Sequence, residues 1–285
     1  RAAAATVPLT LGERQARSLT IELLHDIFPS APDAAGTVAA EWVEAQRASG
    51  ILPIGRHFQR QVDEIVALAE GLKAGLHAGH FDLRALESRD LAAAHQIGRF
   101  RIGGSLQGVQ DQPPQLAIVT ASKTSKGRYD RPLHVAALRL LVARAAGIGT
   151  ERAVVISRHG TWTVGAAEQS WQSRIVMLDE ALMPPQAAAG RLDAIVALTH
   201  EAIGSPRPAF GEMLTKKAED REDAFELTVE GDFYTRSSEC AFFGANPSFA
   251  DVFEKHPERI RFLDAFQRLL DPVYVKKGGG RYIVA

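Results

Sequence analysis

The stretch that decides the fold is residues 115–158, QLAIVTASKTSKGRYDRPLHVAALRLLVARAAGIGTERAVVISR. It begins with an apolar run typical of a β-strand (115–121) and continues through a basic loop to a Leu- and Ala-rich stretch. Pro132 suits a first helical turn, Asp130 suits an N-cap, and Gly147 suits a helix end. A second apolar run follows at 152–158. This order predicts a mixed α/β fold in which a helix covers a sheet.

The residues before this stretch predict a β-hairpin. A Gly-rich run at 100–109 carries Phe100, Ile102 and Leu106, and Gln-Asp-Gln-Pro-Pro at 110–114 reads as a turn. We expect 100–109 to pair with 115–121, the second strand being the more buried. Residues 161–164 are a candidate further strand beside 152–158.

The remaining periodic segments predict helices. Apolar residues recur at helical spacing over five turns at Phe58, Val62, Ile65, Val66, Ala69, Leu72 and Leu76. Further helices are expected over 12–28, around Trp42 and Val43, up to Gly204, and over 257–270. Residues 211–250 show no period and are expected to be irregular. We divide the chain into a helical lead-in (1–95), an α/β core (96–165) and a helical and irregular extension (166–285).

Composition excludes several classes of protein. The 285 residues are 46% hydrophobic and 24% charged, with a net charge of −1, so a large core is expected and a histone-like nucleic-acid binder is not. Cys240 is the single cysteine, which favours a reducing cytoplasm. No apolar run is long enough to span a membrane. The chain begins at Arg1, so we expect it to be a fragment of a longer protein.

Standard catalytic motifs are missing from the sequence. It contains no phosphate-binding loop of the GxxxxGK[ST] type, no GxSxG and no HExxH. His77 and His80 are the closest histidine pair, and such pairs are more often solvated than metal-bound. The glycines at 278–280 have no helix after them and favour a frayed tail. We therefore predict no cofactor.

The hairpin–helix–strand order is the core order of the PD-(D/E)xK nucleases, whose Mg²⁺ site needs an acid on the first strand and acid-x-Lys on the second. Here the first strand offers Gln107, and the second offers Ala121 two residues before Lys123. Amides and methyl groups do not hold a hard divalent cation. We expect a nuclease-like core with no catalytic residue and no metal ligand, unless Asp111 or Glu151 supplies the acid.

The loop after the second strand is the best candidate for binding nucleic acid. Its cations are Lys123, Lys126, Arg128 and Arg131, and hydroxyl side chains lie between them. Such a loop can hold phosphates without reading sequence; the alternative is a solvated surface loop. Two further basic pairs, Arg99 with Arg101 and Arg152 with Arg158, flank predicted strands and either extend the patch or only lie at strand ends.

Aromatic side chains are dense in the irregular segment, at Phe233, Tyr234, Phe242, Phe243, Phe249 and Phe253. They could stack on unpaired bases. Packing of a long loop against the body of the protein is the favoured interpretation. Trp162 and Trp171 are expected in the core or at an interface.

A series of short motifs resembles the C-terminal region of RecC, the gamma subunit of exodeoxyribonuclease V. The motifs are Val-Pro-Leu at 7–9 leading to Leu-Gly-Glu-Arg at 11–14, RASGILPIG at 47–55, the Gly-bearing strand at 101–108, Ser122-Lys123 with Lys126 before a Leu- and Ala-rich helix, and a helix from 187 ending in Gly-x-Pro-x-Pro at 204–208. Their order holds over about 200 residues of this chain.

The resemblance implies a subunit that works with RecB-type and RecD-type subunits in a helicase–nuclease acting on double-stranded DNA ends in recombinational repair. It implies a nuclease-like domain that has lost its catalysis, contacts the RecB-type subunit, and helps to split the duplex and guide the separated single strands. An active Mg²⁺-dependent nuclease and an unrelated cytosolic interaction module are the alternatives.

Overall fold

The computed structural model describes residues 11–31, 34–55, 58–82, 86–91, 95–97, 100–123, 131–150, 152–159, 170–178, 183–204, 213, 218–230, 243–270, 273–277 and 280–283. The chain forms two compact units. The first consists of Arg1–Asp90, Ser105–Ser125 and Ala153–Ile175, and the second of Leu91–Gly104, Lys126–Arg152 and Val176–Ala285. Each is described by itself below.

A mixed sheet is the centre of the first unit. Its neighbouring strands follow the order β8-β7-β6-β5, where β5 is Val109–Asp111, β6 Pro114–Lys123, β7 Arg152–Arg158 and β8 Trp171–Leu178. β5 pairs with β6 antiparallel, and β6 pairs with β7 in parallel. Parallel neighbours need a long crossover connection, and the chain between β6 and β7 contains the helix α4 (Arg131–Ala145). The sequence prediction of a mixed α/β fold is confirmed.

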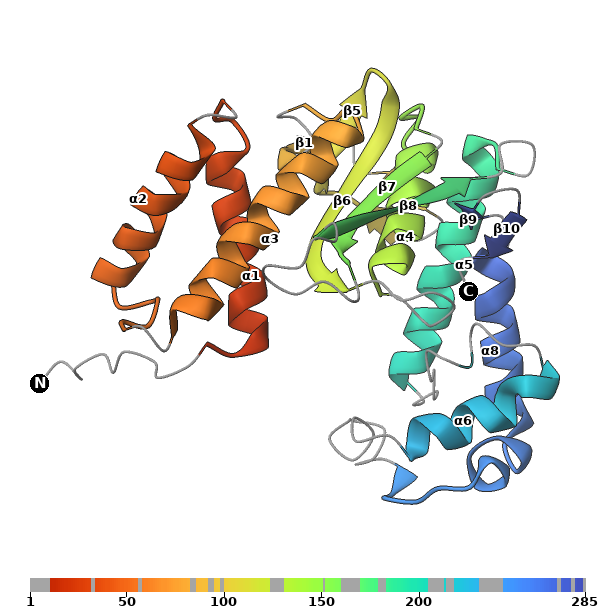
Figure 1. Ribbon diagram of the computed structural model, residues 1–285. Coiled ribbons are helices and arrows are strands. Elements are labelled where there is room, and N and C mark those ends of the chain that lie inside the picture. The colour runs from red at the N-terminus through yellow and green to blue at the C-terminus, as the bar shows by residue number, and fades with distance from the viewer. Residues whose placement is uncertain are drawn as a thin grey trace, which may run out of the picture. The chain divides into compact units, whose positions relative to one another are not determined.

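Two long helices cover one face of this sheet. α1 (Glu13–Ile27) and α3 (Gln59–Ala78) lie side by side and both contact β6 (Figure 1). α2 (Ala35–Ala48) packs on both helices. Apolar side chains of the helices and of the sheet form one core cluster, which includes Leu23, Leu72, Ala117, Val154 and Ile156. The helices begin and end within one or two residues of the predicted positions, because their apolar period of 3.6 is clear.

Two glycines let α3 approach the sheet closely. A Cβ atom on Gly75 would lie 2.8 Å from Cγ2 of Ile156 and 2.9 Å from the ring of Trp171. A Cβ atom on Gly71, one turn earlier, would lie 1.9 Å from Oγ of Ser170. Trp171 is half-buried against the core cluster, which confirms its expected place in the core.

The predicted first strand of the hairpin is wrong in its extent. Instead of one strand over 100–109, the chain forms β3 (Phe100–Ile102), β4 (Ser105–Gln107) and β5, and only β5 pairs with β6. Gly104 and Gly108 interrupt the run with φ values of +119° and +82°, which other residues rarely adopt. β3 instead pairs with β2 (His95–Ile97), and β4 pairs with β1 (Ser88–Asp90).

Gln110 also departs from the predicted turn. It is a buried residue of β5. Its side-chain amide can be buried because backbone groups of the chain satisfy its hydrogen bonds. Nε2 donates to the carbonyl oxygens of His80 and Gln112 at 2.9 and 2.8 Å, and Oε1 accepts the N–H of Asp82 at 3.1 Å. The turn is therefore limited to Gln112 and Pro113. The second strand is the more buried of the two, as predicted.

A buried lysine of α3 caps the C-terminal end of α1. Lys73 on α3 is 6% exposed, and its Nζ donates to the carbonyl oxygens of Ile27 and Ser30, each at 2.7 Å. Cations are favourable at the C-terminus of a helix, where carbonyl groups lack intrahelical partners. Lys73 therefore fixes the position of α1 against α3.

We expect Lys73→Met to lower the free energy of unfolding by about 2 kcal/mol. The variant keeps the apolar stem but removes two charge-assisted hydrogen bonds, each typically worth about 1.5–3 kcal/mol. Part of this loss is offset, because the variant no longer buries a charged group. Urea unfolding measures the loss. Arg60→Met is the matched control, because Arg60 is 78% exposed, and it should change stability by less than about 0.5 kcal/mol.

The same lysine predicts a dependence on pH. Burial lowers the pKa of Lys73 below 10.5, and the nearby Glu70 opposes this shift. Between the lowered pKa and 10.5 the unfolded chain binds more protons than the folded chain, so this group makes stability rise with pH in that window. The stability difference between the native chain and Lys73→Met should widen as pH approaches 10.5. A difference that narrows would contradict the assignment.

The second unit is more helical. α4 packs against α5 (Pro185–Gly204), and Nε of Arg144 donates to the carbonyl oxygen of Met183 at 3.1 Å. α5 also contacts α8 (Pro257–Leu270), where Nη1 of Arg191 donates to the carbonyl oxygens of Arg268 and Leu269. The strands β9 (Val273–Lys277) and β10 (Gly280–Ile283) form an antiparallel hairpin. The predicted helices ending at Gly204 and covering 257–270 are confirmed.

The expectation of an irregular segment over 211–250 is wrong in part. It contains a short 3₁₀-helix (Ala218–Asp220) and α6 (Arg221–Val229), and the π-helix η7 (Ala250–Glu254) begins at its end. α6 escapes a periodicity test because it buries Arg221 and exposes Leu227. Arg221 donates to Oδ1 of Asp264 on α8 at 2.7 Å. A second core cluster forms here from Met213, Ala224, Phe225, Val252, Phe253 and Leu263.

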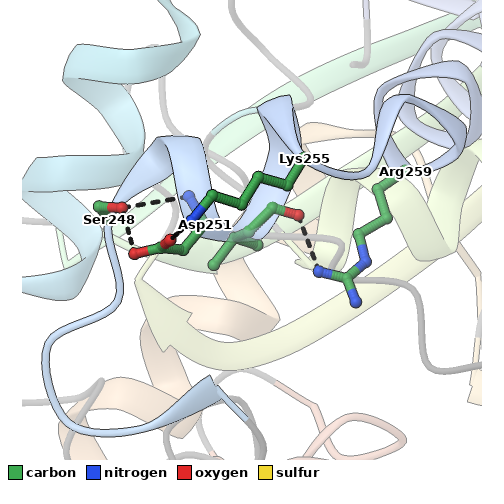
Figure 2. A network of polar contacts seen from close by, with 5 residues as sticks. Ser248, Asp251, Lys255 and Arg259 are labelled. Carbon is green, nitrogen blue, oxygen red and sulfur yellow. Dashed lines mark hydrogen bonds and ion pairs between the residues drawn. The ribbon is translucent and has the colours of Figure 1, made fainter.

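Polar contacts connect η7 to the residues on both sides of it, as Figure 2 shows. Oγ of Ser248 donates to Oδ2 of Asp251 at 2.6 Å and accepts the N–H of Asp251 at 3.1 Å. Lys255 pairs with the same carboxylate, and these contacts hold the pKa of Asp251 below its usual value. Arg259 donates to the carbonyl oxygen of Val252 at 2.8 Å and lies 5.3 Å from the ring centre of Phe243.

Several predictions fall outside the described residues, among them the strand at 161–164, the Asp130 cap and Trp162. None of the helices in the described ranges is both long enough and apolar enough to cross a lipid bilayer.

Candidate nucleic-acid interface

The structure describes part of the basic segment that the sequence predicts to bind nucleic acid. Lys123 is the last residue of β6 and is exposed. Arg131 is the first residue of α4, and its side chain lies outside the described part. Lys126 and Arg128 fall outside the described residues. Lys123 therefore anchors the segment to the carboxyl end of a central strand.

An irregularity near the end of β6 sets the partner of Lys123. Thr120 is opposite Ser157 on β7, but the next residue pair is Lys123 with Arg158. Two residues of β6, Ala121 and Ser122, are thus inserted without a counterpart on β7. The insertion brings two cations opposite each other on neighbouring parallel strands, which lie about 4.8 Å apart.

Arg158 lies on the face of the sheet that α1 and α3 cover. Side chains alternate along a strand, and the core cluster beneath these helices contains Ala117 and Ala121 of β6 together with Val154 and Ile156 of β7. Continuing the β7 series by two residues leads to Arg158, and the strand register places Lys123 opposite it. Lys123 and Arg158 thus lie where the apolar part of these strands ends, and we call this pair the basic edge.

The basic edge suits an anion. Two cationic side chains opposite each other on neighbouring strands can both donate charge-assisted hydrogen bonds to one anion. The other basic residue of β7 cannot join this site. Arg152 stands at the opposite end of the 7-residue strand, about 20 Å away at the rise of a β-strand. Of the two basic residues of β7 that the sequence suggests as an extension of the basic patch, Arg158 lies opposite Lys123 and Arg152 does not.

A pocket of about 240 Å³ opens beside the basic edge, within the first unit. Its apolar lining consists of Leu11, Ala16, Ile65, Leu68 and Ala121. Its polar lining consists of Glu13, Arg17, Thr20, Gln61, Glu64 and Arg158. Arg158 thus belongs both to the pocket and to the basic edge. In open α/β sheets, ligands bind at the carboxyl ends of the strands, and this pocket has that position.

Ion pairs and hydrogen bonds within the chain organise the polar lining. Arg17 pairs with Glu13 one turn earlier on α1. Oε1 of Gln61 accepts the N–H of Leu11 at 3.4 Å, and the hydroxyl of Thr20 donates to the carbonyl oxygen of Ala16 at 2.9 Å. These contacts fix the polar side chains of the lining within the first unit.

The positions at which the sequence predicts that Mg²⁺ ligands are missing lie on different sheets, since β4 pairs with β1 and not with β6. Gln107 is exposed on β4, and Ala121 is 4% exposed in the pocket wall. Asp111, one alternative acid, is exposed on β5, and Glu151 lies outside the described residues. Within the part of the chain that the structure describes, no three His, Cys, Asp or Glu side chains come together as metal ligands would. His77 stacks on Phe28 with ring centres 5.2 Å apart, which is a packing contact.

The dense aromatic residues pack with one another, which confirms the favoured interpretation for those that the structure describes. Phe253 is fully buried, and its ring centre lies 5.8 Å from that of Phe225 and 5.1 Å from that of Phe249. Phe243 and Phe249 are half-buried against the same cluster. Phe233, Tyr234 and Phe242 lie outside the described residues.

Sequence reasoning missed the pocket. Its lining comes from residues that are more than a hundred positions apart, such as Ala16 and Arg158, and no local pattern joins them. The RASGILPIG stretch at 47–55, which carries part of the resemblance, does not line the pocket. Leu52 is fully buried, and Arg47 bonds to Glu44 and Gln59.

The comparison with protein families agrees with the resemblance. The model of the RecC C-terminal domain matches residues 2–222, which is most of the chain and includes β6, α4, β7 and the pocket. No curated protein and no solved structure matches the chain. The family match covers the fold and the candidate site together, and the chain belongs to the RecC C-terminal domain family.

Proposed function

We propose that this chain is the non-catalytic, nuclease-like domain of a RecC-type subunit. In the cytoplasm it would join RecB-type and RecD-type subunits in a helicase–nuclease that acts on double-stranded DNA ends in recombinational repair. Membership of the RecC family implies this complex. The finer role proposed for the domain is to contact the RecB-type subunit and to guide separated strands.

The basic edge is the observation that supports a guiding role. Lys123 and Arg158 meet at the carboxyl ends of two parallel strands, and the predicted cations Lys126, Arg128 and Arg131 follow Lys123 along the chain. Phosphate contacts of this kind hold a DNA strand in place without reading its bases. A domain that guides strands of any sequence needs that form of binding.

The substitutions at the nuclease positions support a role without cleavage. A PD-(D/E)xK centre needs carboxylates where this chain has Gln107 and Ala121, and neither side chain can take a share of the charge of Mg²⁺. Ala121 is part of the apolar pocket wall instead. We propose that residues 96–165 keep the nuclease-like core and use its carboxyl edge to bind a strand.

The basic segment is tested in the assembled complex. We expect Lys126→Ala with Arg128→Ala, and separately Lys123→Ala with Arg158→Ala, to weaken binding of a duplex DNA end. Each removed phosphate contact lowers the slope of log K against log salt by about 0.9, so each double variant should lower the slope by up to about 2. Fluorescence anisotropy over a series of salt concentrations measures both quantities.

The matched control removes two exposed cations elsewhere, Arg261→Ala with Arg268→Ala on α8. It changes the net charge equally and should leave the slope unchanged. Equal slopes in all variants would remove the guiding role. The partner is tested separately by capture of a purified RecB-type subunit on the immobilised chain, and failure to capture it would contradict the proposed complex.

A further inference from the structure

We propose that the pocket beside the basic edge receives a single unpaired base of the guided DNA strand, while the phosphate next to that base binds Lys123 and Arg158. This inference rests on the proposed function. It goes beyond it by naming a base-binding site that is separate from the phosphate contacts.

The size of the pocket limits its occupant. Pockets that enclose whole cofactors or drug-sized ligands measure about 300–1,000 Å³, and this one measures about 240 Å³. A ring system fits, whereas a complete nucleotide does not. The sugar and the phosphate would then remain outside, at the mouth of the pocket.

The lining suits a base better than an aliphatic group. Apolar side chains of Ala16, Leu68 and Ala121 can contact the faces of a ring. Glu13 and Glu64 also line the pocket; each pairs with an exposed arginine of its own helix, Arg17 and Arg60, and their remaining lone pairs can accept hydrogen bonds from the amino and imino groups of bases.

The two cations beside the pocket favour a nucleic acid as its ligand. Arg158 lines the pocket, and Lys123 stands opposite it on the neighbouring strand. A chain that leaves the pocket therefore meets two cations within the spacing of neighbouring strands. A nucleic acid supplies a phosphate at each step, so a base in the pocket and a phosphate at the basic edge can be bound together.

An abasic scan tests the inference in the complex with RecB-type and RecD-type subunits. The probes are forked DNA ends in which one nucleotide at a time, on either strand, lacks its base. We expect one position at which the missing base lowers affinity about tenfold, the scale of a single buried base contact. Other positions should have much smaller effects.

A variant that fills the pocket locates the effect. Ala16→Leu places a larger apolar side chain into the pocket from α1, where the helix accepts leucine readily. It should lower affinity for intact DNA by a similar factor and abolish the effect of the abasic position, because the two changes remove the same contact. Ala16→Met is a milder second variant if Ala16→Leu folds poorly.

Ala74→Leu is the matched control, because Ala74 is an exposed residue of α3. It should keep the abasic effect. A flat scan in the native complex, or an abasic effect that persists in Ala16→Leu, would overturn the pocket. If the abasic scan is flat but Lys123→Ala with Arg158→Ala weakens DNA binding, the pocket is overturned and the proposed function stands. If neither the abasic positions nor this double variant changes the affinity, the pocket and the guiding role are both overturned. A loss of RecB-type subunit binding in Ala16→Leu would assign the pocket to a protein partner and also overturn the inference.

Discussion

Gly108→Ala is expected to lower the free energy of unfolding by about 3 kcal/mol or more, the range of severe single substitutions. Gly108 joins β4 to β5 with φ at +82°, where an L-residue is strained. A Cβ atom there would lie 2.1 Å from the carbonyl oxygen of Ala117. Because that oxygen belongs to the backbone of the central strand, the sheet itself would have to move.

The hydrogen bonds at this position make the movement costly. The N–H of Gly108 donates to the carbonyl oxygen of Glu87 at 3.0 Å, and its carbonyl oxygen accepts the N–H of Ala117 at 2.8 Å. A shift that relieves the contact stretches both bonds. We therefore expect the loss to exceed the strain of the positive φ alone, which is of order 1–2 kcal/mol.

Gly147→Ala separates these two causes. Gly147 follows α4 with a similar φ of +72°, but nothing lies within 4 Å of its added Cβ atom. It should lose only about 1 kcal/mol, the usual cost of replacing a glycine that caps a helix. Urea unfolding of both variants measures the difference. Equal losses would show that close contact with β6 does not matter.

Gly75→Ala is expected to lower the free energy of unfolding by about 1–3 kcal/mol, the cost of overpacking a core. Its Cβ atom would meet Ile156 and the ring of Trp171 below 3 Å. Both neighbours are held in place, since Ile156 is fully buried on β7 and Trp171 packs against the core cluster. The helix would have to move away from the sheet.

The control variant should have the opposite sign. Gly190 lies in α5 with nothing within 4 Å of an added Cβ atom. Gly190→Ala should therefore stabilise the protein by up to about 1 kcal/mol, the gain in helix propensity. Thermal and urea unfolding can rank the two variants. Stabilisation by Gly75→Ala would contradict the close packing of α3 on the sheet.

Gly75 also connects stability to the candidate site. α3 supplies Gln61, Glu64, Ile65 and Leu68 to the pocket, and α1, the sheet and Leu11 supply the rest. A helix pushed away from the sheet widens this space. Gly75→Ala should thus weaken the base contact at the abasic-sensitive position as well as the fold.

The helices of the first unit were predictable because their signal is local. Val62, Ile65, Leu72 and Leu76 repeat at the helical period, and the structure buries all of them. The buried strands at 115–121 and 152–158 were predictable for the same reason. α6 was missed because it breaks the rule that hydrophobic residues face inward, with Arg221 buried and Leu227 exposed.

The candidate site was predictable only in part. A run of cations after a strand identifies Lys123 and its neighbours from the sequence alone. The pairing of Lys123 with Arg158 depends on the two residues inserted into β6, and no local feature announces that insertion. The pocket depends on three segments that come together only when α1 and α3 pack on the sheet.

By itself, the sequence determined the element types, the mixed α/β class, the missing carboxylates at 107 and 121, and membership of the RecC family. The first three features depend on side-chain identity and on spacing within one segment. The family resemblance depends on the order of short motifs along the chain. Tertiary structure alone decided which strands β3 and β4 join, which cation stands opposite Lys123, and where a pocket opens. Register and packing join residues distant in the chain, and those contacts depend on the whole fold rather than on any local pattern.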